Sequence, residues 1–432
     1  MENQDILLLK SAKSGDIKGV CMLLDAGAEV DVSDRHGTTA LMLAANLGYT
    51  EIVRSLLDAG ANINLHRKRY GLTALMLAAS NNQLDIVQLL LSRGADVNAI
   101  NEDGSTALMA AALKGYLDIV QALLAAGAQV DITDKDDDNA WKLAVKSGNV
   151  AVLSLLLQHG ADINHPDAEG ETVLMMAADW GNLDIVQALL AAGANVNQRN
   201  EYGSTALSAA VAAGHNAIPS VSVAIASALL DQGAEINLQD QDGETALHLA
   251  VVEGYIDLVE LLLNRGADSQ ITNNLGDTPL LVAALQGHRQ ILELLLHSAS
   301  QMSATTLGIP LMLAISQGHT DIVKLLLDYG ADANSLGNDS KTALIKAAEG
   351  NYTGIIRLLL AKGANVNFQD LAGATALMWA VSGGYSGAVQ ILLQAGADVN
   401  LKNRGGYTAL MIAEFNGYQN ILQSLQKAGA QE

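Results

Sequence analysis

A single cysteine, Cys21, is present among the 432 residues of this sequence. A disulfide within one chain and a zinc site built from cysteines are therefore both excluded. So low a cysteine content is typical of proteins from a reducing compartment. Cys21 lies between Val20 and Leu24 in an expected helix, so we expect a buried, apolar thiol rather than a reactive one.

Long apolar segments are missing as well. Runs such as Leu89-Leu90-Leu91 are far too short to cross a bilayer, so no membrane insertion is expected. The segment from Met1 to Lys10 carries acids and no basic region, which predicts that it is not a signal peptide and that the protein is cytoplasmic. With only four prolines, the sequence shows no long disordered linker.

Positive charge is scarce. Lysine and arginine total 24 against 46 aspartates and glutamates, which gives a formal net charge of −22. Such a chain repels phosphate backbones, so nucleic-acid binding is disfavoured. Aromatic residues make up 3% of the sequence, whereas hydrophobic residues make up 50% and are mostly Ala, Leu, Val and Ile. Small residues of this kind favour close packing of helix on helix.

What the sequence does contain is an internal repeat. The pair Gly-Ala recurs about every 33 residues, at positions 27, 60, 94, 127, 160, 193, 233, 266, 330, 363, 396 and 429, and Ser298-Ala299 stands in its place once. Thirteen such units occupy essentially all 432 positions. Repeats of this length stack into one elongated body in which each unit contacts its neighbours. No stretch is left for a separate catalytic domain, so we expect no enzyme.

One unit shows how the repeat predicts its structure. Gly37 supplies a turn, and Thr39 is placed to cap a short helix that ends at Gly48. A second helix is expected over residues 51–58, with its apolar side chains on one face, and Gly60 closes it. The unit is therefore a turn followed by two short helices and an extended segment.

These units resemble the ankyrin repeat, whose hallmark is a turn, the motif T-P-L-H-x-A-A, a second helix and a closing G-A-D-V-N. Thr-Ala-Leu begins at Thr39, Thr73, Thr106, Thr205, Thr245, Thr342, Thr375 and Thr408, and Thr278-Pro279-Leu280 matches the family motif most closely. The closing motif occurs at Asp96-Val97-Asn98, Asn195-Val196-Asn197, Asn365-Val366-Asn367 and Asp398-Val399-Asn400. The resemblance covers the whole chain. It implies an all-α solenoid of paired antiparallel helices with β-turn or hairpin tips.

Methionine often takes the family's histidine position after the leucine. It does so at Met42, Met76, Met109, Met175, Met312, Met378 and Met411, while His248 keeps the family residue. We expect this methionine stripe to pack between repeats, because methionine fills irregular gaps. The alternative is a soft contact surface. This T-A-L-M form looks like that of many bacterial ankyrin proteins.

The repeat departs from its regular spacing at two places. Gly193 and Gly233 are 40 residues apart, and the excess lies in His215–Ser222, where Pro219 suits a first helical turn. We expect a longer second helix or a bulged loop, either as a tolerated surface insertion or as a contact for a partner. The second departure, Ser298–Gly308, has a shortened turn without its acid-Gly signature.

These departures divide one predicted repeat domain, residues 1–432, into seven parts. They are an N-terminal capping repeat at 1–33, regular repeats at 34–199, a repeat with a seven-residue insertion at 200–239, regular repeats at 240–300, a degenerate repeat at 301–335, regular repeats at 336–402 and a C-terminal capping repeat at 403–432.

No motif for catalysis, metal binding or a cofactor is present. His215, His288 and His319 share one repeat position after the glycine that ends the first helix, which indicates a structural role. The asparagine that closes many units resembles a hydroxylation site of the family, but we favour a turn-stabilising side chain. It occurs at Asn64, Asn98, Asn164, Asn197, Asn237, Asn334, Asn367 and Asn400.

The resemblance implies that partners bind the turn tips and the exposed side of the first helix. From the fourth to the ninth unit the tips are acidic, with Glu102, Asp103, Asp136, Asp138, Glu169, Glu171, Glu201, Asp242, Glu244 and Asp277. Lys135 is the one opposing charge at those positions. Acidic tips suit a protein partner with a basic segment, although they also serve solubility. The expected binder is a monomer that acts as an adaptor, scaffold or regulator.

Aromatic side chains are candidate anchors on this surface. Trp180, Tyr202, Tyr407 and Phe415 occupy groove or tip positions. Trp141 replaces a core leucine and is expected to be buried, and Trp379 falls at an inward position. The alternative function is a host-directed or stress-related factor that inhibits an enzyme by covering its surface.

Overall fold

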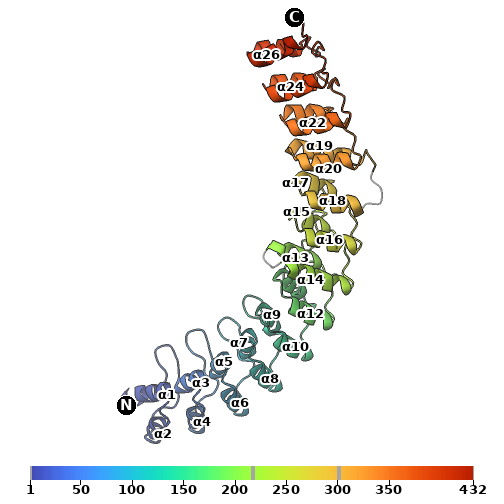
Figure 1. The fold of residues 1–432 in the computed structure, drawn as a ribbon. Helices are drawn as coiled ribbons and strands as arrows, with labels where there is room; N and C mark the ends of the chain where they lie inside the picture. The colour runs from blue at the N-terminus through green and yellow to red at the C-terminus, as the bar shows by residue number, and fades with distance from the viewer. Residues whose placement is uncertain (1, 216–218, 299–302, 432) are drawn as a thin grey trace. The chain divides into compact units, whose positions relative to one another are not determined.

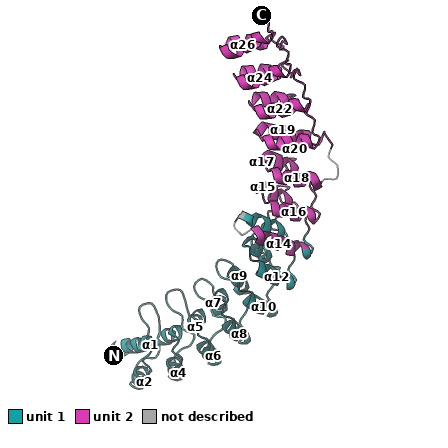
Figure 2. Ribbon diagram, in the orientation of Figure 1, with its two compact units in different colours: residues 1–201, 205–217, 231–234 teal, residues 202–204, 218–230, 235–432 magenta. Residues whose placement is uncertain are grey.

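The computed structural model describes residues 2–215, 219–298 and 303–431, and these residues form 26 α-helices with one short 3-10 helix (Figure 1). Named strands are absent from those residues, which contain only the isolated antiparallel bridges Ser33–Thr39 and Leu336–Thr342. The expected all-α solenoid of paired helices is thereby confirmed. The chain divides into two compact units, of residues 1–201, 205–217 and 231–234, and of residues 202–204, 218–230 and 235–432 (Figure 2).

Unit 1 contains two layers of short helices. Each first helix packs on the first helix of the next repeat, as in α3·α5 and α5·α7, and second helices pack likewise, as in α4·α6. The first helices are α1 (Glu2–Ser14), α3 (Ala40–Leu47), α5 (Ala74–Ser80), α7 (Ala107–Lys114), α9 (Ala140–Lys146), α11 (Val173–Asp179) and α13 (Ala206–Ala212), the last continued by the 3-10 helix Ala213–His215. The second helices are α2 (Ile17–Asp25), α4 (Thr50–Asp58), α6 (Leu84–Ser92), α8 (Leu117–Ala125), α10 (Val150–Gln158) and α12 (Leu183–Ala191).

Unit 2 repeats the same two layers. Its first helices are α15 (Ala246–Val252), α17 (Pro279–Gln286), α19 (Gly308–Gln317), α21 (Ala343–Glu349), α23 (Ala376–Ser382) and α25 (Ala409–Asn416). Its second helices are α14 (Pro219–Asp231, whose last residue belongs to unit 1), α16 (Ile256–Asn264), α18 (Arg289–Ser298), α20 (Thr320–Asp328), α22 (Thr353–Ala361), α24 (Ser386–Gln394) and α26 (Gln419–Lys427). The boundaries of the individual repeats stay a prediction.

The helix ends follow the sequence signals. Thr39 Oγ1 accepts a hydrogen bond from the Met42 N–H at 3.3 Å, and the same threonine cap recurs along the chain. Gly48 ends α3 with a φ of 85°, in the left-handed region that glycine enters without a steric penalty. In contrast, α19 begins after Leu307 with no side-chain cap, because this unit lacks the threonine.

Small and branched apolar side chains fill the space between the layers. Ala44, Ala45 and Leu56 are fully buried. The methionine stripe is buried with them, with 1% exposure for Met42 and Met109, so the packing interpretation is confirmed for this part of the stripe. The corresponding members near the degenerate unit and the last helix pair are only half-buried: Met312 and Met411.

Side chains of three types hold consecutive repeats together. Asn64 Oδ1 accepts the Asp96 N–H at 2.9 Å, and the same bond recurs about every 33 residues, which confirms the structural role of this asparagine position. His319 Nε2 bonds to the Leu285 carbonyl at 3.0 Å, and His288 contacts the Val252 carbonyl in the same way. His248, the one family histidine at its position, contacts Thr245 Oγ1 at 2.9 Å and the Asp277 carbonyl at 3.1 Å.

Helix α14 and Cys21 differ in how they agree with the sequence-based expectations. Helix α14 begins at Pro219 and has 13 residues where most second helices have nine, so the longer second helix is confirmed; residues 216–218 of the insertion lie outside the described residues. Cys21 is half-buried rather than buried, and its Sγ lies 3.8 Å from Ser55 Oγ. It lies on α2, which packs against a second helix on one side only, namely α4. Among the described residues, no helix has the length and apolarity needed to cross a membrane.

Candidate functional site

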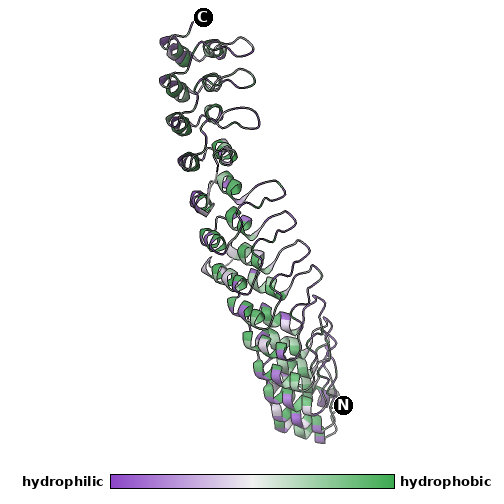
Figure 3. Ribbon diagram, turned by 90° about the vertical axis from the view of Figure 1, so that its right-hand side faces the viewer, coloured by the Kyte–Doolittle hydropathy of each residue, from purple (hydrophilic) through white to green (hydrophobic). Residues whose placement is uncertain are grey.

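Loops between the second helix of one repeat and the first helix of the next project to one side of the helices (Figure 3). In most of these loops an Asp or Asn, and in one loop Gly337, starts a five-residue turn, which we call a finger. Asp167, for example, accepts hydrogen bonds from the Glu169 and Glu171 N–H groups at 3.0 and 2.8 Å. The regular fingers are residues 34–38, 101–105, 134–138, 167–171, 240–244, 273–277, 337–341, 370–374 and 403–407.

Backbone hydrogen bonds join many neighbouring fingers. The Lys135 N–H donates to the Asp103 carbonyl at 2.8 Å, and the Glu201 N–H donates to the Glu169 carbonyl at 3.0 Å. The side chains at these tips are therefore held at regular intervals on a fixed backbone. This arrangement turns a sequence of separate acidic residues into an ordered row within each unit.

The acidic candidates in unit 1 are mostly exposed. Their exposed members are Glu102, Asp103, Asp136, Glu169 and Glu201, and Glu171 is half-buried. Asp138 differs, because it is only 9% exposed and its carboxylate binds Lys146 Nζ at 2.6 Å. Asp138 therefore presents little surface to a partner, which corrects the expectation that it is an open acidic tip.

Glu171 lies near three other carboxylates of unit 1. Burial raises the pKa of its carboxyl group, and the nearby carboxylates of Asp167, Asp179 and Glu169 raise it further. No lysine or arginine of the described residues forms an ion pair with Glu169, Glu171 or Asp179. The cluster thus has an uncompensated negative potential that a cation would relieve.

Three acidic candidates belong to unit 2. Asp242 is exposed, whereas Glu244 and Asp277 are half-buried. Their fingers are joined through the Asn274 N–H, which donates to the Asp242 carbonyl at 2.9 Å. The predicted acidic tips are therefore divided into two sets, one in each unit.

The four aromatic candidates are all exposed, as a contact role requires. The exposed fractions are 46% for Trp180 in unit 1, and 60% for Tyr202, 57% for Tyr407 and 92% for Phe415 in unit 2. Trp141 is 1% exposed, so its expected burial is confirmed. Each unit therefore carries at least one solvent-exposed ring on or near the first helices and fingers.

An apolar row along the first helices was missed by the sequence reasoning. At the fourth position after the cap, or at the equivalent repeat position in α19, most first helices present a half-buried apolar side chain. The row consists of Leu43, Leu77, Leu143 and Met176 in unit 1, and Leu249, Leu313, Trp379 and Ile412 in unit 2. The spacing of these residues, about 33 positions, could have revealed the row from the sequence. It did not, because apolar residues in a short helix more often lie in the core.

Trp379 is part of a polar network that the sequence did not reveal. Its Nε1–H donates to Asp370 Oδ2 at 2.9 Å, and Lys341 Nζ lies 3.7 Å from the centre of its ring. Lys341 also binds Glu349 at 2.9 Å. These contacts join the fingers of two consecutive repeats to the first helices.

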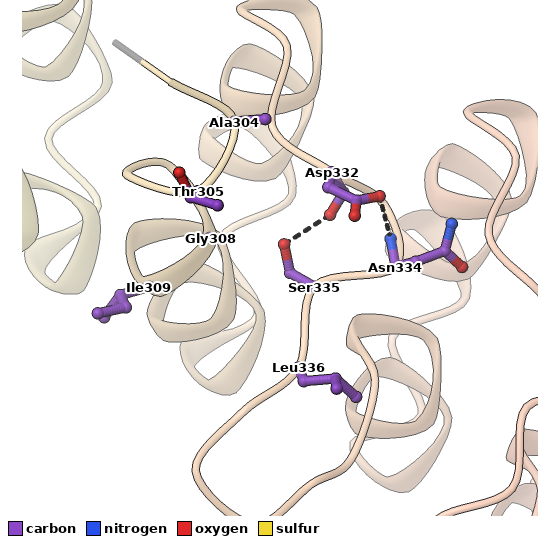
Figure 4. A pocket seen from close by; sticks show the side chains of 8 residues that line it. All are labelled: Ala304, Thr305, Gly308, Ile309, Asp332, Asn334, Ser335 and Leu336. Atoms are coloured by element: carbon purple, nitrogen blue, oxygen red, sulfur yellow. Dashed lines mark hydrogen bonds between the residues drawn. The ribbon is translucent and has the colours of Figure 1, made fainter.

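The described residues contain no group of three or more His, Cys, Asp or Glu side chains that could hold a metal ion. One hollow in unit 2, of about 360 Å³, lies between residues 304–309 and residues 332–336 (Figure 4). Its wall contains one charged side chain, Asp332, and no histidine or cysteine.

The comparisons with known proteins agree with this architecture. A family model described as ankyrin repeats (3 copies) matches residues 8–101, 95–167, 142–221, 215–306, 306–370 and 362–431. Ankyrin repeat, SAM and basic leucine zipper domain-containing protein 1 of Atelerix albiventris is 43% identical over 68 residues, which are 16% of this chain and 14% of that protein. Its namesake from Mus musculus is 42% identical over 69 residues, with the same two shares, 16% and 14%.

This chain therefore spans 14% of the length of these curated relatives. The likeness to them is limited to a short segment of repeats. The family model, in contrast, matches in succession from residue 8 to residue 431. Because these matches cover nearly all of its residues, the chain belongs to the ankyrin-repeat family.

Proposed function

We propose that this chain binds a protein partner through the face formed by its fingers and first helices, and that it acts as a non-enzymatic adaptor, scaffold or regulator. Ankyrin repeats indicate a protein–protein interaction module. One observation carries the finer proposal: Glu169, Glu171 and Asp179 form an unpaired acidic cluster next to the exposed Trp180.

This combination favours a basic segment of the partner. An arginine or lysine side chain placed at the cluster neutralises carboxylates that now repel one another, so the charge interaction adds to affinity and to the rate of encounter. The ring of Trp180 offers an apolar surface to the stem of that side chain and a cation–π contact to its head. The half-buried Met176 and Leu143 accept the apolar residues of the same segment.

Unit 2 offers a second acidic surface of the same kind. Asp242, Glu244 and Asp277 lie on two fingers joined by a backbone hydrogen bond, and Leu249 is half-buried on the helix that follows the first of them. Each unit is therefore sufficient to bind a basic segment. A partner with two such segments gains affinity by engaging both.

The test uses the full chain and a fluorescein-labelled amphipathic peptide of arginine and leucine. Its binding is measured by fluorescence anisotropy in wild type, in a unit 1 variant (Glu169→Lys with Glu171→Lys) and in a unit 2 variant (Asp242→Lys with Glu244→Lys). We expect each variant to lose the site in its own unit and to bind about half as much peptide at saturation as wild type. The two pairs of substitutions combined are expected to weaken binding at least about tenfold, with a smaller dependence of affinity on salt.

Two controls define the outcome. The variant Asp25→Lys with Glu260→Lys changes the net charge by the same amount on exposed residues of second helices. A second peptide replaces every arginine with glutamate. Equal binding of both peptides, or equal weakening in the control variant, contradicts the proposed face.

A further inference from the structure

The row of fingers in unit 2 is interrupted beside α19. At other junctions of this unit, though not between the fingers 337–341 and 370–374, a finger N–H donates to the carbonyl of the preceding finger, as from Asn274 to Asp242 and from Arg404 to Ala372, both at 2.9 Å. Residues 303–307 instead form a compact turn that leads directly into α19. Within the described residues, no finger therefore stands between the finger 273–277 and the finger 337–341.

Two backbone groups face this interruption without a partner. By repeat position, the Leu275 carbonyl corresponds to that of Asp242, which accepts a hydrogen bond from the next finger. The Asn338 N–H corresponds to that of Asn274, which donates to the preceding finger. Within the part of the chain that the structure describes, neither group forms a hydrogen bond. The interruption thus leaves one acceptor and one donor of the regular ladder open.

Apolar side chains collect at the same place. Leu275 and Leu336, on the two sides of the interruption, are 86% and 55% exposed, and Ile309 at the start of α19 is 62% exposed. The corresponding residues of neighbouring repeats are polar: Asp242 corresponds to Leu275, and Gln369 to Leu336. Exposed apolar side chains that lie together are typical of a surface that a partner covers.

The hollow of about 360 Å³ lies at the interruption, between the turn that replaces the finger and the segment that leads to the next finger (Figure 4). The Asn334 N–H donates to Asp332 Oδ1 at 2.9 Å, and Ser335 Oγ donates to the Asp332 carbonyl at 2.7 Å. These bonds hold Asp332, Asn334 and Ser335, which form the polar wall of the hollow, in a fixed arrangement. The opposite wall is Ala304, Thr305 and Ile309.

We infer that this interruption binds an extended, uncharged apolar peptide of a partner protein, which takes the place of the missing finger. The inference rests on the proposed protein-binding function and names a second kind of segment for it. A backbone carbonyl of the peptide accepts a hydrogen bond from the Asn338 N–H, and a backbone N–H of the peptide donates one to the Leu275 carbonyl. Its apolar side chains pack on Leu275 and Leu336. Addition of an extended segment to open backbone groups is a common mode of peptide recognition.

The residues around the interruption favour an extended apolar peptide over a basic segment or a second copy of the chain. A basic segment finds few carboxylates here, because residues 303–319 contain no acidic side chain. A finger from a second copy of the chain is closed by its own turn, and most fingers carry polar tip residues such as Asp242 and Asn274, which do not match the leucines. An extended apolar peptide matches both the open backbone groups and the exposed side chains.

The test is a selection of random seven-residue peptides displayed on phage, with the immobilised full chain as target. Binders are then synthesised and measured by fluorescence anisotropy against two variants. In the first, residues 271–278 replace residues 303–309 and so restore a finger. The second carries Leu275→Asp and Leu336→Gln, each the residue at the same position of a neighbouring repeat, so it is compatible with the fold and remains informative if the first variant misfolds.

We expect apolar, uncharged peptides to be enriched and to lose at least about tenfold in affinity for both variants. Equal affinity for wild type and the second variant overturns the inference. Enrichment of basic peptides that lose affinity in the Glu169→Lys, Glu171→Lys variant also overturns it, while supporting the proposed acidic face. Self-association of the full chain that the two leucine substitutions abolish overturns it in favour of a second copy.

Discussion

The Nζ atom of Lys341 lies 3.7 Å from the centre of the Trp379 ring, so a finger of one repeat is joined to the first helix of the next by a cation–π contact. The Lys341 side chain is only 15% exposed and also binds Glu349. No backbone hydrogen bond joins the described finger 337–341 to the finger 370–374. Side chains therefore replace the backbone link at this junction.

Replacing Lys341 with methionine is expected to destabilise unit 2 by about 1 kcal/mol, because it removes a partly desolvated cation–π contact and an ion pair but keeps the apolar stem. Urea unfolding followed by circular dichroism measures the change. The control is Lys362→Met, which breaks an ion pair with Asp328 between side chains that are 46% and 48% exposed. Equal losses in the two variants contradict a special role for the Lys341–Trp379 contact.

Stability is expected to depend on pH through His248. Burial lowers the pKa of its imidazole below the usual 6.5, although the Asp277 carbonyl and the charges of Glu244 and Asp240 oppose the shift. The unfolded chain therefore binds the proton first as the pH falls. The stabilisation is complete above the unfolded pKa and declines as the pH falls from about 7 toward the lower pKa of the folded state.

His248→Met gives this position the residue of seven other repeats. Between about pH 7 and pH 5, the free energy of unfolding of this variant is expected to fall less than that of wild type, as measured by urea titrations at several pH values. His165→Met, at an exposed histidine, is the control. Parallel curves for wild type and His248→Met reject the assignment.

Glu171 is expected to make stability depend on pH in the direction opposite to that of His248. Burial and the nearby carboxylates raise the pKa of its carboxyl group in the folded state. Stability is therefore greatest below the unfolded value of about 4.5 and declines as the pH rises through the raised pKa. Glu171→Gln is expected to stabilise the chain at pH 7 by less than about 1 kcal/mol, because solvent screens this half-exposed group.

The gain from Glu171→Gln is expected to vanish at pH 4, where the wild-type carboxyl group is already neutral. Thermal unfolding at both pH values measures it. Glu102→Gln, at an exposed tip, serves as the control. A gain of equal size at pH 4 shows that the effect has a cause other than charge.

The asparagine that closes each repeat can be tested at one junction. Asn367 Oδ1 accepts the Asp398 N–H at 2.8 Å, so Asn367→Ala is expected to cost about 1 kcal/mol in urea unfolding. Asn367→Asp keeps the acceptor oxygen and is expected to cost less, since Asp31 makes the same bond to the Asn62 N–H at 2.9 Å. An aspartate variant as unstable as the alanine variant contradicts the role of this oxygen.

The regular parts of the fold were predictable because each repeat carries its own signals. Thr39 as a cap, Gly48 as a helix end and the short apolar helices all act within a few residues, and the structure confirms them. The burial of Trp141 was predictable for the same reason, because its repeat position is a core position. Local chemistry repeated along the chain thus determined the architecture.

The candidate site was less predictable, because exposure depends on neighbours in space. Asp138 and Asp136 differ by two positions in one finger, yet only Asp138 binds Lys146 and is buried. The Leu275 carbonyl is open at the place where the next finger is missing from the row. Neither fact follows from residue types alone.

The sequence by itself determined that this is an acidic, all-helical array of ankyrin repeats, because the periodic caps, glycines and apolar positions leave one way to bury the helices. Only the tertiary structure decided which acids remain unpaired, that Lys341 lies against Trp379, and that the row of fingers opens beside α19. These features arise from contacts between different repeats, and the chemistry of such a contact depends on both of its members.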